Sequence, residues 1–139
     1  MKRIMVFVFI LVLTPLLFGG TRLGNAKETR GVTNDTIKVG VIEDLTGPVS
    51  DSCKPIADGI KNYFLYTNDQ GGINGRNVRV IIEDNRYSIP LTLASFKKLL
   101  HRDEVFAMDS APTGGVTALF SLIEKHKVPF MTANMAYTM

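Results

Sequence analysis

The sequence has little of what disulfide-rich domains and many catalytic sites are built from. Its 139 residues include one cysteine, two histidines and no tryptophan. The single cysteine excludes a disulfide within the chain, so Cys53 is expected to be a small semi-buried residue or to pair with a cysteine outside it. Charged residues make up 21% and hydrophobic residues 45%. These proportions exclude a disordered or fibrous protein.

Recognised catalytic motifs are also absent. The chain has no Gly-x-Ser-x-Gly elbow and no Walker pattern. The glycine-rich run 71–75 follows a predicted helix and precedes a predicted strand, which is the reverse of the order in a dinucleotide-binding loop. His101 and His126 fall in the last turns of predicted helices, where they favour the helix dipole. The sequence therefore predicts no enzyme, no catalytic residue, no cofactor and no metal ligand.

The small positive charge is confined to the start of the chain. Lys2, Arg3 and Arg22 precede Ala26, and no acidic residue does. The whole chain has 16 basic and 13 acidic residues, so the part after Ala26 is neutral. A neutral chain with scattered lysines and arginines does not predict a nucleic-acid partner.

Residues 1–26 have the layout of a secretory signal peptide. Two basic residues are followed by an apolar run from Ile4 to Phe18 and by the small-residue sequence Gly-Asn-Ala at 24–26. The run has about 15 residues, fewer than the ~20 needed to cross a bilayer. We predict cleavage after Ala26, an N-terminal linker over 27–35 and a periplasmic location; an uncut membrane anchor is the alternative. Export argues against a phosphoacceptor receiver, although acids end two predicted strands.

The remaining chain alternates strand and helix patterns. Apolar runs predict strands at 36–43, 77–84, 105–109 and 128–132. A helix is predicted over 55–69, with Ile56, Ile60 and Phe64 as its buried stripe. Two more helices are predicted, one containing Leu93, Phe96 and Leu100 and one containing Val116, Leu119, Phe120 and Ile123. This order predicts an α/β fold with a parallel sheet and flanking helices. No helix is predicted after the last strand, so we expect residues 36–139 to be a truncated, partial lobe.

Several segments together resemble a known family. Val-Gly-Val-Ile at 39–42, Leu-Thr-Gly-Pro at 45–48 and Asn-Asp-Gln-Gly-Gly-Ile-Asn-Gly-Arg at 68–76 are similar to the opening of type I periplasmic binding proteins of the Leu/Ile/Val-binding group. The small-residue loop 110–116 and Val-Pro-Phe at 128–130 match the same pattern in order and spacing. The family fold has two α/β lobes joined by a hinge, with the solute between them, and the resemblance covers the first part of lobe one.

The resemblance implies a non-enzymatic solute-binding protein of an ABC importer. Its ligand would be a branched-chain amino acid or a related small polar solute, and its partner a membrane permease. The alternative is the ligand-binding sensor domain of a receptor or regulator with the same fold. The sequence does not predict the solute or the oligomeric state.

Ligands of open α/β sheets bind beyond the carboxyl ends of the strands. There, Ser110 and Thr113 offer hydroxyl groups, and Gly114 exposes a backbone N–H group at a predicted helix N-terminus. These three residues are predicted to bind the ligand's carboxylate, the alternative being a helix cap. Thr46 either contacts the ligand or forms a turn.

The resemblance adds two further candidates. It implies that Asn134 and Tyr137 lie where the family holds the other polar end of its ligand. Tyr137 has the alternative of an interface between lobes.

Overall fold

The computed structural model describes residues 29–132 and contains a four-stranded, all-parallel sheet. Its strands are β1 (Thr36–Glu43), β2 (Asn77–Asp84), β3 (Ala107–Asp109) and β4 (Phe130–Met131), in the order β2-β1-β3-β4. The helices are α1 (Ser50–Asp69), α2 (Ile89–His101) and α3 (Thr113–His126). The predicted α/β fold with a parallel sheet is confirmed.

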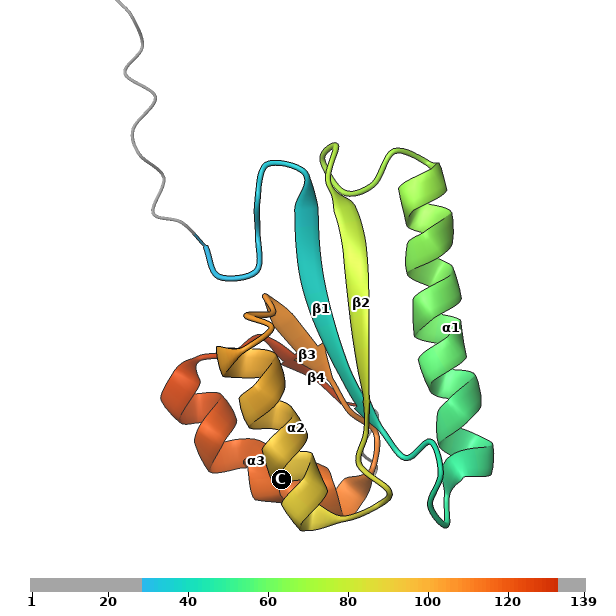
Figure 1. Ribbon diagram of the computed structural model, residues 1–139, viewed down its shortest axis with the longest axis vertical. Coiled ribbons are helices and arrows are strands. Elements are labelled where there is room, and N and C mark those ends of the chain that lie inside the picture. Colours follow the sequence, from blue (N-terminus) through green and yellow to red (C-terminus); the bar gives the residue numbers. More distant parts are fainter. Residues whose placement is uncertain (1–28, 133–139) are drawn as a thin grey trace, which may run out of the picture.

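The helices cover the two faces of the sheet unequally. Figure 1 shows α1 on one side, beside β1 and β2, and α2 with α3 on the other. The main core lies on the α2–α3 side and consists of buried apolar side chains: Ile42, Phe96, Leu99, Leu100, Val105, Met108, Leu119 and Val128. The strand arrows all point toward one edge, which is therefore the edge where any ligand of this fold class is expected.

Close contact between α2 and α3 depends on Gly115. A Cβ atom at this position would lie 2.7 Å from Thr92 Oγ1, inside the contact distance of real side chains. Gly115 and Thr92 are both buried. The absence of a side chain at 115 thus lets the N-terminal turn of α3 pack against α2.

Helix α1 differs from its prediction in two respects. It begins at Ser50 rather than Pro55, so the proline lies inside the helix and not in its first turn. Cys53 and Ala57 are its buried residues, whereas Ile56 is 37% exposed, so the predicted stripe was misplaced at that end. Strands β3 and β4 are also shorter than predicted.

The end of α1 follows the prediction. Gly71 and Gly72 have φ angles of 97° and 73°, in the left-handed region that glycine adopts cheaply. Just before them, Asn68 bonds both backbone groups of Val78: Val78 N–H donates to Asn68 Oδ1 (2.7 Å), and Asn68 Nδ2 donates to Val78 O (2.9 Å). This side chain fixes the end of α1 against the start of β2.

Residues 29–35 run against the amino-terminal edge of the sheet. Lys38 N–H donates to Gly31 O at 2.8 Å, and Arg30 Nε donates to Val105 O at 3.0 Å. Gly31 has a φ of 73°, and a Cβ there would lie 2.2 Å from Phe106 N. The predicted signal peptide, 1–26, lies outside the described residues. Among the helices of residues 29–132, none has the length and apolar character needed to span a membrane.

Candidate functional site

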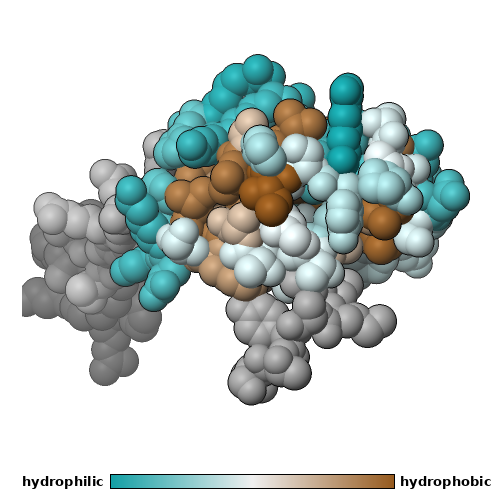
Figure 2. Space-filling model, turned by 90° about the horizontal axis from the view of Figure 1, so that it is seen from below, coloured by the Kyte–Doolittle hydropathy of each residue, from teal (hydrophilic) through white to brown (hydrophobic). Residues whose placement is uncertain are grey.

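The carboxyl-terminal edge of the sheet contains a change of direction. Strand β2 lies on one side of β1 and β3 lies on the other, and the connections leaving the neighbouring strands β1 and β3 lead to α1 and α3 on opposite faces of the sheet. Crevices at such points are the usual ligand sites of open α/β sheets. Figure 2 views the molecule from this side and shows apolar side chains near the centre with polar ones at the flanks. Exposed apolar residues here include Tyr87, Ile89, Leu91 and Met131.

Two carboxylates at this edge hold the connection between β1 and α1. Asp44 is buried and accepts hydrogen bonds from the N–H groups of Gly47 and Val49. Such carboxylate–amide bonds close the turn that leads into α1. The Gly-Pro turn predicted from the sequence is therefore stabilised by the acid that precedes it.

Asp84, at the end of β2, binds the same connection from the other side. Its Oδ1 accepts from Leu45 N–H (2.9 Å) and Arg86 N–H (3.0 Å), and its Oδ2 accepts from Thr46 Oγ1 (2.6 Å). Burial raises the pKa of Asp84, but the hydrogen bonds from Thr46, Leu45 and Arg86 together lower it below its usual value. Thr46 is exposed, and its hydroxyl group donates a hydrogen bond to Asp84.

The connection from β3 to α3 is tied to both neighbouring strands. Ser110 is fully buried, and its hydroxyl donates to Ile42 O at 2.7 Å. Its backbone N–H donates to Met131 O at 3.3 Å. The next N–H, of Ala111, donates to Glu43 Oε1 at 2.8 Å. Residues 110–115, called the amide loop below, are thus held by the ends of β1 and β4.

Helix α3 begins without a side-chain cap. Pro112 is its N-cap residue, and the first backbone bond of the helix is Val116 N–H to Pro112 O. Among the described residues, the N–H groups of Thr113, Gly114 and Gly115 have no hydrogen-bond partner. Gly114 is exposed, with open space where a Cβ would stand. Uncapped amides at a helix N-terminus form a site suited to an anionic group.

Glu43 lies beneath the amide loop and was not proposed as a binding-site residue from the sequence. It is fully buried, and within the described residues its Oε2 atom has no hydrogen-bond partner. Burial raises the pKa of Glu43 to about 7. Burial also raises the pKa of Asp109, at the end of β3. The signal available in the sequence was the alternation along β1, which places Glu43 on the same face as Val41 and Val39.

The structure brings Ser110, Thr113 and Gly114 together on the amide loop and places Thr46 on the connection after β1. Asn134 and Tyr137 lie outside the described residues. Over residues 29–132, no group of three or more His, Cys, Asp and Glu side chains is arranged to hold a metal ion.

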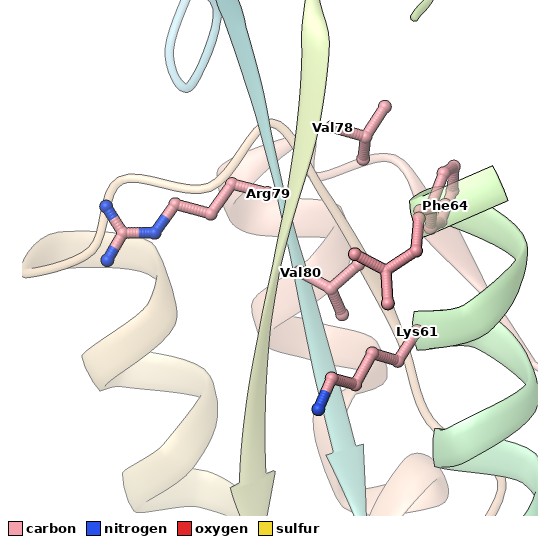
Figure 3. A pocket seen from close by; sticks show the side chains of 6 residues that line it. Lys61, Phe64, Val78, Arg79 and Val80 are labelled. Carbon is pink, nitrogen blue, oxygen red and sulfur yellow. The ribbon is translucent and has the colours of Figure 1, made fainter. Parts of the chain in front are cut away.

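A separate groove lies between α1 and β2, away from the amide loop. It has a volume of about 270 Å³ and is lined by Lys61, Phe64, Leu65, Val78, Arg79 and Val80. Figure 3 shows Val78 and Val80 facing α1, whereas Arg79 extends to the opposite side of the strand. The lining of this groove thus lacks the several converging polar groups that orient a polar ligand.

A parallel sheet with an uncapped helix N-terminus at its carboxyl edge is an arrangement that open α/β folds use to bind ligands. A periplasmic binding protein family model matches residues 36–138, about three quarters of the chain. The chain belongs to the periplasmic binding protein family, and its fold is that of the type I members.

Solved structures of solute-binding proteins share this fold. A fatty acid ABC transporter substrate-binding protein from Thermomonospora curvata is 27% identical (TM-score 0.70), and the match covers 77% of this chain and 27% of that one. A solute-binding protein from Rhodopseudomonas palustris BisB5, in complex with 3,4-dihydroxybenzoic acid, is 28% identical (TM-score 0.63; 72% and 27% covered). A branched-chain amino acid ABC transporter protein from Thermus thermophilus with bound valine is 22% identical (TM-score 0.69; 75% and 27% covered).

The chain thus spans about a quarter of the length of these structures. Two of the three are named as substrate- or solute-binding proteins, and the third is named as a branched-chain amino acid ABC transporter. No curated protein matches the chain.

Proposed function

We propose that this chain forms part of the ligand-binding lobe of an exported solute-binding protein that serves an ABC importer. Its ligand is a small carboxylate with an apolar body, with branched-chain amino acids as the leading class. The uncapped amides of Thr113, Gly114 and Gly115 carry this proposal, because they present three donors at the edge where the fold places its ligands.

The surroundings of the amide loop favour a ligand that also has a positive end. Asp44, Asp84 and Asp109 all lie at strand ends on this edge. Asp44 and Asp84 are already bonded to backbone N–H groups. A simple anion would be repelled by this group of acids, whereas the ammonium group of an amino acid is attracted by it.

Exposed apolar side chains on the same edge match a ligand with an apolar body. Tyr87, Ile89 and Met131 are 47%, 47% and 72% exposed. The structures described above are of proteins named for fatty acids or solved with 3,4-dihydroxybenzoic acid or valine. All three ligands combine a carboxylate with an apolar or aromatic body, and valine among them also has the ammonium group that the acids of this edge favour.

The binding residues remain those of the amide loop. Thr113 and Gly114 contact the ligand's carboxylate, and Ser110 acts by fixing the loop to β1 through its buried hydroxyl group. Thr46 is exposed on the connection between β1 and α1. Its hydroxyl proton is donated to Asp84, so its Oγ1 atom contacts the ligand as an acceptor. Asn134 and Tyr137 are proposed to hold the ligand's other polar end.

The remaining parts of the proposal concern export and transport. Residues 1–26 act as a signal peptide that directs the protein to the periplasm, and a membrane permease receives the solute. Membership of the periplasmic binding protein family supports this location and this partner.

The test is calorimetric titration of the full chain with L-isoleucine, L-valine, 3,4-dihydroxybenzoate and a medium-chain fatty acid. We expect weak but saturable binding of at least one carboxylate, because the family resemblance implies a solute held between two lobes and this chain forms part of one. Gly114→Asp places a competing carboxylate on the loop amides and should weaken that binding at least tenfold. The fold should survive, because an acid in the first turn favours a helix by about 0.3–1 kcal/mol.

Gly59→Asp is the matched control. Gly59 is also an exposed helical glycine with open space at its Cβ position, but it lies within α1. Equal ligand affinity of the two variants would show that the amide loop is not part of the binding site. Failure of every carboxylate to bind would contradict the proposed function.

A further inference from the structure

Glu43 is the one fully buried carboxyl group at the binding edge, among the described residues, with an unsatisfied oxygen. Its Oε2 atom has no partner there, although its Oε1 accepts from Ala111 N–H at 2.8 Å. An unpaired buried carboxylate oxygen is costly, because an ionised group loses its hydration without compensation. A proton on this carboxyl group removes most of that cost.

The position of Glu43 couples this proton to the amide loop. Its side chain holds Ala111, and the carbonyl of the preceding residue, Ile42, holds the Ser110 hydroxyl at 2.7 Å. The backbone carbonyl of Glu43 also accepts from Asn85 N–H at 2.9 Å, which ties it to the end of β2. The loop is therefore fixed at its base by two adjacent residues of β1.

Groups from three elements face the Glu43 carboxyl. Burial has the largest effect on its pKa and raises it, and repulsion from Asp109 on β3 and from Asp44, next in the chain, acts in the same direction. The hydrogen bond from the Ala111 amide and the proximity of the Cys53 thiol on α1 lower the pKa but do not offset burial. No lysine or arginine contributes a stabilising charge to this balance within the described residues.

We infer that Glu43 is a positioning residue for the amide loop, and that it takes up a proton when the loop binds a carboxylate. The inference rests on the proposed function for its ligand. Neutral Glu43 places no negative charge beneath the amides of Thr113 and Gly114, so that an anion bound there is not repelled. Ionised Glu43 places a negative charge beneath the loop that presents those amides and draws water toward Oε2.

The size of the coupling can be worked out from electrostatics. Two like charges at neighbouring positions, in a medium with an effective dielectric between protein and water, repel one another enough to change an affinity about tenfold. Carboxylate binding should therefore be about ten times tighter below neutral pH than above it. By linkage, a bound carboxylate should raise the pH at which Glu43 ionises.

The first experiment needs no ligand. In the full chain, the carboxyl carbon of Glu43 and the amide of Ala111 are followed by NMR between about pH 4.5 and 8.5. Both signals should titrate together, with a midpoint near the pKa of about 7. In Glu43→Gln, which mimics the protonated group and keeps an acceptor for Ala111, the Ala111 titration should disappear. A Glu43 midpoint no higher than that of an ordinary glutamate, about 4.3, would overturn the inference.

The second experiment measures L-isoleucine affinity by calorimetry from about pH 5.5 to 8.5, where the charges of the ligand stay nearly constant. The affinity of the original chain should fall about tenfold, whereas Glu43→Gln should keep the low-pH affinity throughout. His126→Gln is the control, because histidine titrates in the same range but His126 ends α3 at the opposite edge.

The outcomes separate the two proposals. A flat profile for the original chain, or a pH dependence retained in Glu43→Gln, would refute proton-linked binding while leaving the carboxylate site intact. If L-isoleucine does not bind at any pH, that ligand is excluded, and the NMR titration still decides whether Glu43 and the amide loop share a proton equilibrium.

Discussion

Replacing Asp84 tests whether one carboxylate holds the connection between β1 and α1. Asp84→Asn keeps an acceptor oxygen for Leu45 and Arg86, and its new amide group can donate to Thr46. The three hydrogen bonds survive in neutral form, so the variant isolates the contribution of the charge. Asp84→Ala removes all three and leaves the Leu45 N–H group without its partner.

The magnitude depends on the bonds that the structure shows. Hydrogen bonds to a charged group contribute about 1.5–3 kcal/mol, against about 1 for neutral pairs. The hydrogen bond from Leu45 N–H is partly buried, whereas the hydrogen bonds from Thr46 and Arg86 are exposed and contribute less. The Arg86 Nε–Asp84 Oδ2 pair, at 3.6 Å with a 69% exposed arginine side chain, adds about 0.5 kcal/mol at most. We expect losses of about 1–2 kcal/mol for Asp84→Asn and about 3 kcal/mol for Asp84→Ala.

The pH dependence gives the sharper test. The pKa of Asp84 is lowered in the folded protein, so its contribution is present above the unfolded pKa and is lost as the pH falls through the folded value. Urea denaturation at pH 7 should show the full loss for Asp84→Asn, whereas the variant and the original chain should converge at about pH 2–3. Asp58→Asn, at an exposed position in α1, is the matched control.

Two results would refute this reasoning. If Asp84→Asn were as stable as the original chain at pH 7, the charge would contribute nothing to the connection. If its loss were the same at neutral pH and in acid, the effect would come from altered packing rather than from the ionised carboxylate.

Two other contacts yield separate predictions for thermal denaturation. Gly115→Val should lower the melting temperature by about 8 °C or more, because its side chain would clash with Thr92 and separate α3 from α2; an unchanged value would contradict this packing. Asn68→Ala should cost about 2 kcal/mol, because both backbone groups of Val78 lose a partner; Asn68→Asp should recover part of the loss by keeping the acceptor, and equal loss in both variants would count against the acceptor role.

The order of strands and helices could be predicted because it depends on local patterns. Apolar runs and turn residues predicted the bounds of β1 and β2 without error, and Gly71–Gly72 correctly marked the end of α1. These features depend on residues adjacent in the chain. Their agreement with the structure reflects consistency between local preference and the whole fold.

The start of α1 could not be predicted because tertiary contacts decide it. Proline suits the first turn of a helix, where its missing N–H group costs nothing, and this favoured a helix beginning at Pro55. In the structure, Asp44 accepts from Val49 N–H, and Cys53 is buried against the sheet. These contacts favour an extra helical turn ahead of the proline.

The candidate site was predictable in position but not in its full composition. Ser110, Thr113 and Gly114 could be proposed because hydroxyl and glycine residues at a helix start form a local pattern. The hydrogen bond from Ser110 to Ile42 joins residues 68 positions apart, and no local sequence pattern predicts it. The same holds for Glu43 and Ala111, which are equally distant along the chain.

The close packing of Gly31 against Phe106 has a practical consequence for binding measurements. Because Gly31 and Arg30 are fastened beside the start of β3, a shortened chain that begins at Thr29 would have its first residue at the far end of the sheet from the amide loop. Such a chain could be tethered to a sensor surface through its N-terminus with the solute-facing rim pointing outward into the sample.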